Sequence, residues 1–136
     1  MGGIYDADAL VKIHQAGSNL RAAFDAEMKA GRANICMDTR DEIKDCYPEI
    51  WAQIKDAGIR IVREDDETET LWAVYMEQLN PISATDSGLV QSKLSVIATA
   101  VRHKLSIYSS DTAQISISLH SICTELSIDC MEPHEI

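Results

Sequence analysis

The chain has 136 residues, the size of one globular domain. Hydrophobic residues make up 46% and charged residues 25%, which excludes a disordered chain, a collagen and a disulfide-held miniprotein. The 22 acidic against 12 basic residues give a net charge of -10, which excludes a broadly basic protein that coats nucleic acid. A small basic groove on an acidic body remains compatible with that charge. We therefore expect a single domain over residues 1–136.

Neither a leader nor a membrane anchor is expected. The first ten residues, MGGIYDADAL, have no basic segment and no long apolar segment, so they do not resemble a signal peptide. No apolar run approaches the roughly 18 residues of a membrane span. The four cysteines form no CxxC pair and match no zinc-site spacing. We expect a soluble cytoplasmic protein with reduced, mostly buried thiols.

Short apolar segments alternate with helical patterns along the whole chain. Ser18 is expected to cap a helix, Pro48 to open one, Gly31 and Gly58 to close two, and Pro81 to stop another. The expected strands are 4–5, 34–37, 59–62, 105–108 and 128–131. The expected helices are 7–14, 18–29, one from residue 39, 48–57, 67–79, 86–103 and 112–126.

This alternation predicts the α/β class, with a short central parallel sheet flanked by helices in three layers. In such folds ligands bind at the carboxyl ends of the strands. The polar residues just after the expected strands are mostly acids: Asp6, Asp8, Asp38, Thr39, Glu42 and Asp111. Carboxylates that converge at one edge repel each other unless a cation lies between them. Oxygen-only ligands favour Mg²⁺ or Mn²⁺ over zinc.

Three segments resemble, in order and spacing, the motifs of PIN domains, the small nuclease fold of VapC-type toxins. Residues 4–10 (IYDADAL) resemble the opening strand and acid, and residues 39–43 (TRDEI) resemble the second motif, in which a Thr lies three residues before a Glu. Residues 95–100 (SVIATA) with 105–111 (LSIYSSD) resemble the third block, an alanine-rich helix followed by a strand that ends in Ser-x-Asp. The resemblance covers nearly the whole chain.

The resemblance implies a three-layer PIN-like fold and a ribonuclease that cleaves single-stranded RNA. It assigns Mg²⁺ or Mn²⁺ to Asp6, Glu42 and Asp111, with Asp86 as a further catalytic carboxylate. Such a metal lowers the pKa of a bound water and stabilises charge on the scissile phosphate, so no side-chain nucleophile is needed. The implied partners are the RNA substrate, an antitoxin-type protein and a second copy of the chain.

One position departs from the family pattern. The usual third acid lies about five residues before the Ala98-x-Ala100 pair, where this chain has Lys93. The nearest acid, Asp86, lies seven residues earlier, about two turns and roughly 10 Å along a helix. Either Asp86 serves near the helix start, or Lys93 places a positive charge where the family has a ligand. A third alternative is that Lys93 contacts a phosphate.

Each candidate carboxylate also has a structural interpretation. Asp6, Asp86 and Asp111 each precede an expected helix and can cap it, and Asp8 can stabilise a first turn. Thr39-x-x-Glu42 has the pattern of a capping box. Ser109 either positions Asp111 or a metal, or serves in a turn. Basic residues for an RNA groove are Lys12, Arg40, Lys93, Arg102 and Lys104.

Two further functions stay open at this stage. Lys93 favours a catalytically reduced PIN-like binding module with a basic, antitoxin-like partner. Asp6-Ala7-Asp8 also resembles the Asp-x-Asp opening of haloacid dehalogenase-like phosphatases, in which Asp6 would be the nucleophile and Asp8 the acid/base. The chain is short for that fold and lacks its downstream lysine and acid pair, so we rank it last.

Overall fold

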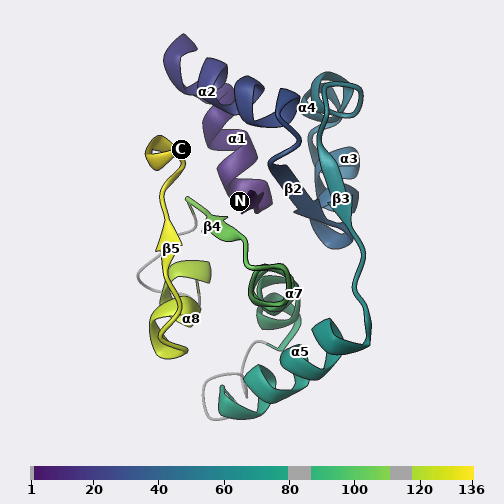
Figure 1. Ribbon diagram of the computed structural model, residues 1–136, viewed down its shortest axis with the longest axis vertical. Helices are drawn as coiled ribbons and strands as arrows, with labels where there is room; N and C mark the ends of the chain where they lie inside the picture. Colours follow the sequence, from purple (N-terminus) through teal and green to yellow (C-terminus); the bar gives the residue numbers. More distant parts are fainter. Residues whose placement is uncertain (1, 80–86, 111–117) are drawn as a thin grey trace.

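A five-stranded sheet, parallel throughout, forms the centre of the protein (Figure 1). The computed structural model describes residues 2–79, 87–110 and 118–136, and for residues 87–90 it describes the backbone. The strand order is β3-β2-β1-β4-β5. The strands are β1 (Gly3–Tyr5), β2 (Ala33–Cys36), β3 (Arg60–Val62), β4 (Ser106–Tyr108) and β5 (Cys130–Met131). The predicted α/β class and short parallel sheet are confirmed.

Helices connect successive strands and cover both faces of the sheet. In the described ranges they are α1 (Ala7–Gln15), α2 (Ser18–Lys29), α3 (Met37–Cys46), α4 (Pro48–Ile54), α5 (Asp66–Gln78), α7 (Ser87–His103) and α8 (Leu119–Glu125), with a 3₁₀ turn at Pro133–Glu135. None of these described helices combines the length and apolarity that crossing a bilayer requires.

Two hydrophobic cores lie on opposite faces of the sheet, and the alternation of strand residues assigns each side chain to one of them. On β1, Ile4 packs into the core formed with α5, α7 and α8, whereas Tyr5 packs with α1–α4. On β2, Cys36 joins the first core and Ile35 the second. Figure 1 shows the same division, with α1 and α2 on one side of the strands and α5, α7 and α8 on the other.

The glycine that begins β1 leaves room for an aromatic side chain of β4. A Cβ on Gly3 would lie 2.6 Å from the ring of Tyr108. Tyr108 in turn stacks on Tyr5, with ring centroids 5.0 Å apart and planes 12° apart. A side chain at position 3 would displace this aromatic pair, and with it the strand ends that carry the candidate site.

The boundaries of several helices differ from the sequence expectation. Helix α3 begins at Met37, directly after β2, rather than at Thr39. Gly17, not Ser18, is the N-cap of α2, and α4 ends at Ile54 rather than at residue 57. The local capping signals were wrong by one to three residues because the adjoining strand and turn fix where each helix starts or ends. Residues 112–117 of the predicted last helix lie outside the described ranges.

All four cysteines are free thiols, as expected. The expectation that most are buried holds for Cys36 and Cys123, while Cys130 is half-buried and Cys46 is exposed. Cys36 lies at the end of β2, and Cys46 ends α3. Burial raises the pKa of the Cys36 thiol, so this group behaves as a small apolar core residue.

Candidate functional site: an acidic pocket at the carboxyl edge of the sheet

The strand order reverses between β1 and β4. From β1 the chain proceeds to β2 and β3 on one side, and from β4 it proceeds to β5 on the other. In open parallel sheets, the crevice outside the carboxyl ends at such a point is the usual ligand site. Asp6 follows β1 and Ser109 follows β4, so the fold places these two residues on the two sides of that crevice.

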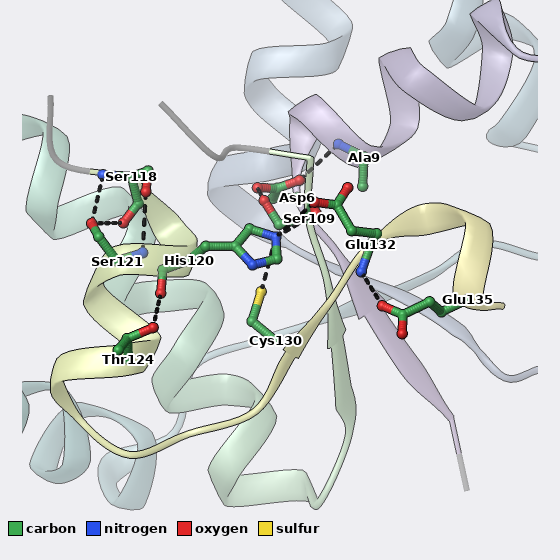
Figure 2. A network of polar contacts seen from close by, with 10 residues as sticks. All are labelled: Asp6, Ala9, Ser109, Ser118, His120, Ser121, Thr124, Cys130, Glu132 and Glu135. Atoms are coloured by element: carbon green, nitrogen blue, oxygen red, sulfur yellow. Dashed lines mark hydrogen bonds and ion pairs between the residues drawn. The ribbon is translucent and has the colours of Figure 1, made fainter. Parts of the chain in front are cut away.

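Asp6 is held by contacts to both of its carboxylate oxygens. Its Oδ1 accepts a hydrogen bond from the backbone N–H of Ala9 at 2.8 Å, so Asp6 is the N-cap of α1. Its Oδ2 accepts a hydrogen bond from the hydroxyl of the buried Ser109 (Figure 2). The capping role predicted for Asp6 is therefore confirmed, and the carboxylate also joins two strand ends that are remote in sequence.

A second layer of contacts holds Ser109 from the C-terminal part of the chain. The imidazole Nε2–H of His120, on α8, donates to the Ser109 carbonyl oxygen at 2.7 Å. The Cys130 thiol lies 3.7 Å from the same nitrogen, and Glu132 Oε1 lies 4.0 Å from it (Figure 2). No sequence signal pointed to His120, because this contact depends on how α8 and β5 pack against β4.

The carboxylates of Asp6, Asp8, Asp38 and Glu42 line one pocket of about 250 Å³, which we call the acidic pocket. The first two come from the start of α1 and the last two from α3. Across from them, α7 contributes Ser92, Lys93 and Val96, and Leu119 of α8 completes the lining. The predicted gathering of Asp6 and Glu42 at one sheet edge is thus present in the described part.

Glu42 is not part of a capping box. Helix α3 has Cys36 as its N-cap with no side-chain capping bond, and the hydroxyl of Thr39 instead contacts the Cys36 sulfur at 3.3 Å. The Glu42 carboxylate is therefore directed to the acidic pocket. Loss of hydration raises the pKa of Glu42, the negative charge of Asp8 raises it further, and Lys93 opposes both effects.

Lys93 lies among these carboxylates. It is half-buried on α7 and lines the acidic pocket together with Asp6, Asp8 and Glu42. The side chain that departs from the resembled motif is thus in the site rather than on the outer face of its helix. Its positive charge lowers the pKa of Glu42, which shows that it acts on the candidate ligands electrostatically.

Two of the predicted site residues, Asp86 and Asp111, lie outside the described residues. Within ranges 2–79, 87–110 and 118–136, no group of three or more His, Cys, Asp and Glu side chains is arranged to hold a metal ion. The carboxylates that line the acidic pocket are all oxygen donors, the ligand type that Mg²⁺ and Mn²⁺ prefer.

A second pocket, of about 610 Å³, adjoins the acidic pocket through Asp38, which lines both. We call it the tryptophan pocket, because Trp72 of α5 forms part of its wall together with Asp41, Arg63, Glu64 and Glu69. Of the basic residues expected to line an RNA groove, Arg40 pairs with Asp41 at 2.9 Å. Arg102 pairs with Asp65 and Glu67 at 3.2 and 3.0 Å. Neighbouring acids therefore engage both arginines.

Comparisons with known proteins reveal structural similarity but no sequence match. No family model matches the chain, and no curated protein matches its sequence. The fold is similar to that of a chain from a toxin-antitoxin complex of Klebsiella pneumoniae, with a TM-score of 0.55 and 15% sequence identity. The similarity covers 84% of this chain and 92% of that chain. At this identity the similarity concerns the fold alone.

Proposed function

We propose that the protein is a metal-dependent ribonuclease of the PIN type, acting on single-stranded RNA with Mg²⁺ or Mn²⁺. The observation that carries the proposal is the acidic pocket, in which Asp6 and Glu42 from separate elements meet at the topological switch point of the sheet. The fold similarity to a chain of a toxin-antitoxin complex supports the same class of protein.

Asp6 and Glu42 would hold the metal, together with Asp111, which follows β4 in the sequence. A bound cation of this kind supplies a water of lowered pKa and stabilises charge on phosphate oxygens. The protein itself would contribute by holding the metal-binding carboxylates in fixed positions. Ala9 and Ser109 fix both oxygens of Asp6 by hydrogen bonds.

A binding module with reduced catalysis is the second candidate, and Lys93 favours it. An ammonium group beside carboxylates competes with a divalent cation for the same oxygens. It also offers a contact to a phosphate group. In this case the acidic pocket would bind a partner or RNA without cleaving it.

We further propose an antitoxin-type protein as a partner. The net charge of -10 favours association with a basic protein, because complementary charge steers encounter and suppresses wrong partners. Self-association as a homodimer stays a prediction from the family resemblance. Size-exclusion chromatography with light scattering would measure it directly.

The test is cleavage of a panel of single-stranded RNAs by the purified protein with Mn²⁺ or Mg²⁺. We expect Asp6→Asn to lower the cleavage rate at least about 100-fold, because an amide keeps the shape of the side chain and loses the charge that holds the cation. Asp25→Asn, which removes an equal charge on α2 away from the acidic pocket, is the matched control and should keep the rate.

Circular dichroism must show that Asp6→Asn stays folded, since Asn also caps helices well. Wild-type protein that binds these RNAs and cleaves none of them would reject the ribonuclease and favour the binding module.

A further inference from the structure

A third pocket, of about 430 Å³, extends from the amino ends of β1 and β4 along the edge strand β3, and we call it the basic pocket. Its lining includes Gly2 and Leu105, which directly precede β1 and β4, and Arg60, the first residue of β3. Arg63 and His103 add two more nitrogen-bearing side chains. β3 is the edge strand of the sheet (Figure 1), and all three of its residues line this pocket.

Among the residues that the structure describes, the lining of the basic pocket contains no carboxylate. Its members are Gly2, Gly31, Asn34, Arg60, Ile61, Val62, Arg63, His103 and Leu105. Within the described ranges none of Arg60, Arg63 and His103 forms an ion pair, and Arg60 makes only a 3.4 Å contact to the carbonyl of Gly31. On a chain with a net charge of -10, these two exposed arginines, which form no ion pair within the described ranges, concentrate positive charge in one pocket.

One carboxylate near this pocket is engaged elsewhere. The pKa of Asp65 is lowered chiefly by its hydrogen bonds to Thr68, with smaller contributions from Arg102 and His103. Asp65 accepts hydrogen bonds from the backbone N–H and the hydroxyl of Thr68, both at 2.8 Å. It also pairs with Arg102 at 3.2 Å. The cations of the basic pocket therefore keep their donors for a ligand.

The basic pocket is a separate site rather than an extension of the acidic pocket. The tryptophan pocket lies between them, since it shares Arg63 with the basic pocket and Asp38 with the acidic pocket. Asp38, Asp41, Glu64 and Glu69 line that intervening space. These acids would repel a chain of phosphates that ran from one end to the other.

We propose that the basic pocket binds a phosphate group through Arg60 and Arg63, with His103 as an additional N–H donor. Guanidinium groups carry a permanent charge and a planar set of donors that matches phosphate oxygens. The volume of about 430 Å³ lies within the range of roughly 300–1,000 Å³ typical of small-ligand pockets. The phosphate belongs either to a free phosphorylated compound or to an RNA terminus.

Calorimetric titration with pyrophosphate in metal-free buffer tests the proposal. We expect millimolar or tighter binding to the wild type and a loss of at least tenfold in affinity for Arg60→Gln/Arg63→Gln. The matched control is Arg21→Gln/Lys55→Gln, which removes two positive charges from residues outside the basic pocket and should bind as the wild type does. No detectable binding to the wild type, or equal affinity in all three proteins, would overturn the proposal.

Competition by RNA separates the two sources of the phosphate group. If a 5′-phosphorylated oligonucleotide displaces pyrophosphate and its unphosphorylated form does not, the ligand is an RNA terminus. If neither oligonucleotide displaces it and a mononucleotide does, the ligand is a free phosphorylated compound. Both outcomes require Arg60 and Arg63, and neither depends on cleavage, so failure of the ribonuclease proposal leaves this test intact.

Discussion

The acidic pocket and the basic pocket lie at different parts of the sheet and carry opposite charge. Asp6, Asp8, Asp38 and Glu42 line the first, at the carboxyl edge, and Arg60, Arg63 and His103 line the second, along the edge strand β3 and the end of α7. In the acidic pocket, charged groups are held by contacts from several elements. In the basic pocket, they project from the edge strand and the end of α7 without ion pairs within the described ranges.

The difference lies in how each pocket is constrained. Two hydrogen bonds hold Asp6, and His120 in turn holds Ser109, so the acidic pocket is preorganised from three parts of the chain. Preorganised groups suit chemistry, because fixed charges need no rearrangement during reaction. Exposed arginines suit binding, because their donors can adjust to a phosphate. Substitutions that act on one pocket and leave the other unchanged test this division.

The largest effect is expected from Lys93→Asp. The substitution removes the ammonium that competes for the carboxylates of the acidic pocket and supplies the acid that the PIN pattern has at this position. We expect Mn²⁺ affinity to rise about tenfold or more, equivalent to about 1.4 kcal/mol, as measured by calorimetry. Pyrophosphate binding to the basic pocket should not change.

Lys55→Asp is the matched control for this charge change, since Lys55 lies outside all three pockets. If Asp86 already serves as the missing ligand, Lys93→Asp should change Mn²⁺ affinity little, and Asp86→Asn should weaken it as much as Asp6→Asn does. Unchanged affinity in all these variants would mean that neither residue 86 nor residue 93 acts on the metal.

An intermediate effect is expected at His120, which we assign as a positioning residue for Ser109 and through it for Asp6. His120→Ala removes the N–H that holds the Ser109 carbonyl, and we expect RNA cleavage to fall about fivefold with unchanged pyrophosphate binding. His120→Gln restores an N–H donor and should recover most of the rate. If Ala and Gln variants lose the same activity, the hydrogen bond is not the cause.

The smallest effect is expected from Glu42→Gln on stability. The raised pKa of Glu42 means that its ionised form is disfavoured in the folded protein. Below the ordinary glutamate pKa, Glu42 is protonated in both the folded and the unfolded protein, so its titration costs no stability. As the pH rises from that value toward the raised pKa, the free energy of unfolding falls, because Glu42 ionises more readily in the unfolded protein. Glu42→Gln should therefore raise the melting temperature by about 1–2 °C at pH 7 and leave it unchanged near pH 4.

The effect of Mn²⁺ on the melting temperature tests the role of Glu42 in a second way. Mn²⁺ should raise the melting temperature of the wild type, because a ligand that binds the folded state stabilises it, and the response should weaken in Glu42→Gln. Glu49→Gln, an exposed change on α4, is the control and should show neither effect. A stable Glu42→Gln with an unaltered Mn²⁺ response would remove Glu42 from the proposed ligands.

Local patterns in the sequence determined which segments form strands and which face of the sheet each strand residue occupies. Short apolar segments became strands, and the alternation of Ile4 with Tyr5 divided the two cores, because strand side chains point to opposite faces in turn. Asp6 could be selected because it directly follows an apolar strand. The capping box at Thr39 was the misleading local signal, since β2 leads directly into α3 at Met37.

Only the tertiary structure decided which charged groups meet. Lys93 faces Asp6, Asp8 and Glu42 because α7 packs on one face of the sheet, across from the starts of α1 and α3. His120 reaches Ser109, and His103 joins Arg60 and Arg63, by packing between elements that are separate in sequence. The pairing order of parallel strands depends on long-range contacts, whereas the periodicity of apolar residues reports only local structure. The sequence therefore determined the candidate acids, and the fold determined their neighbours.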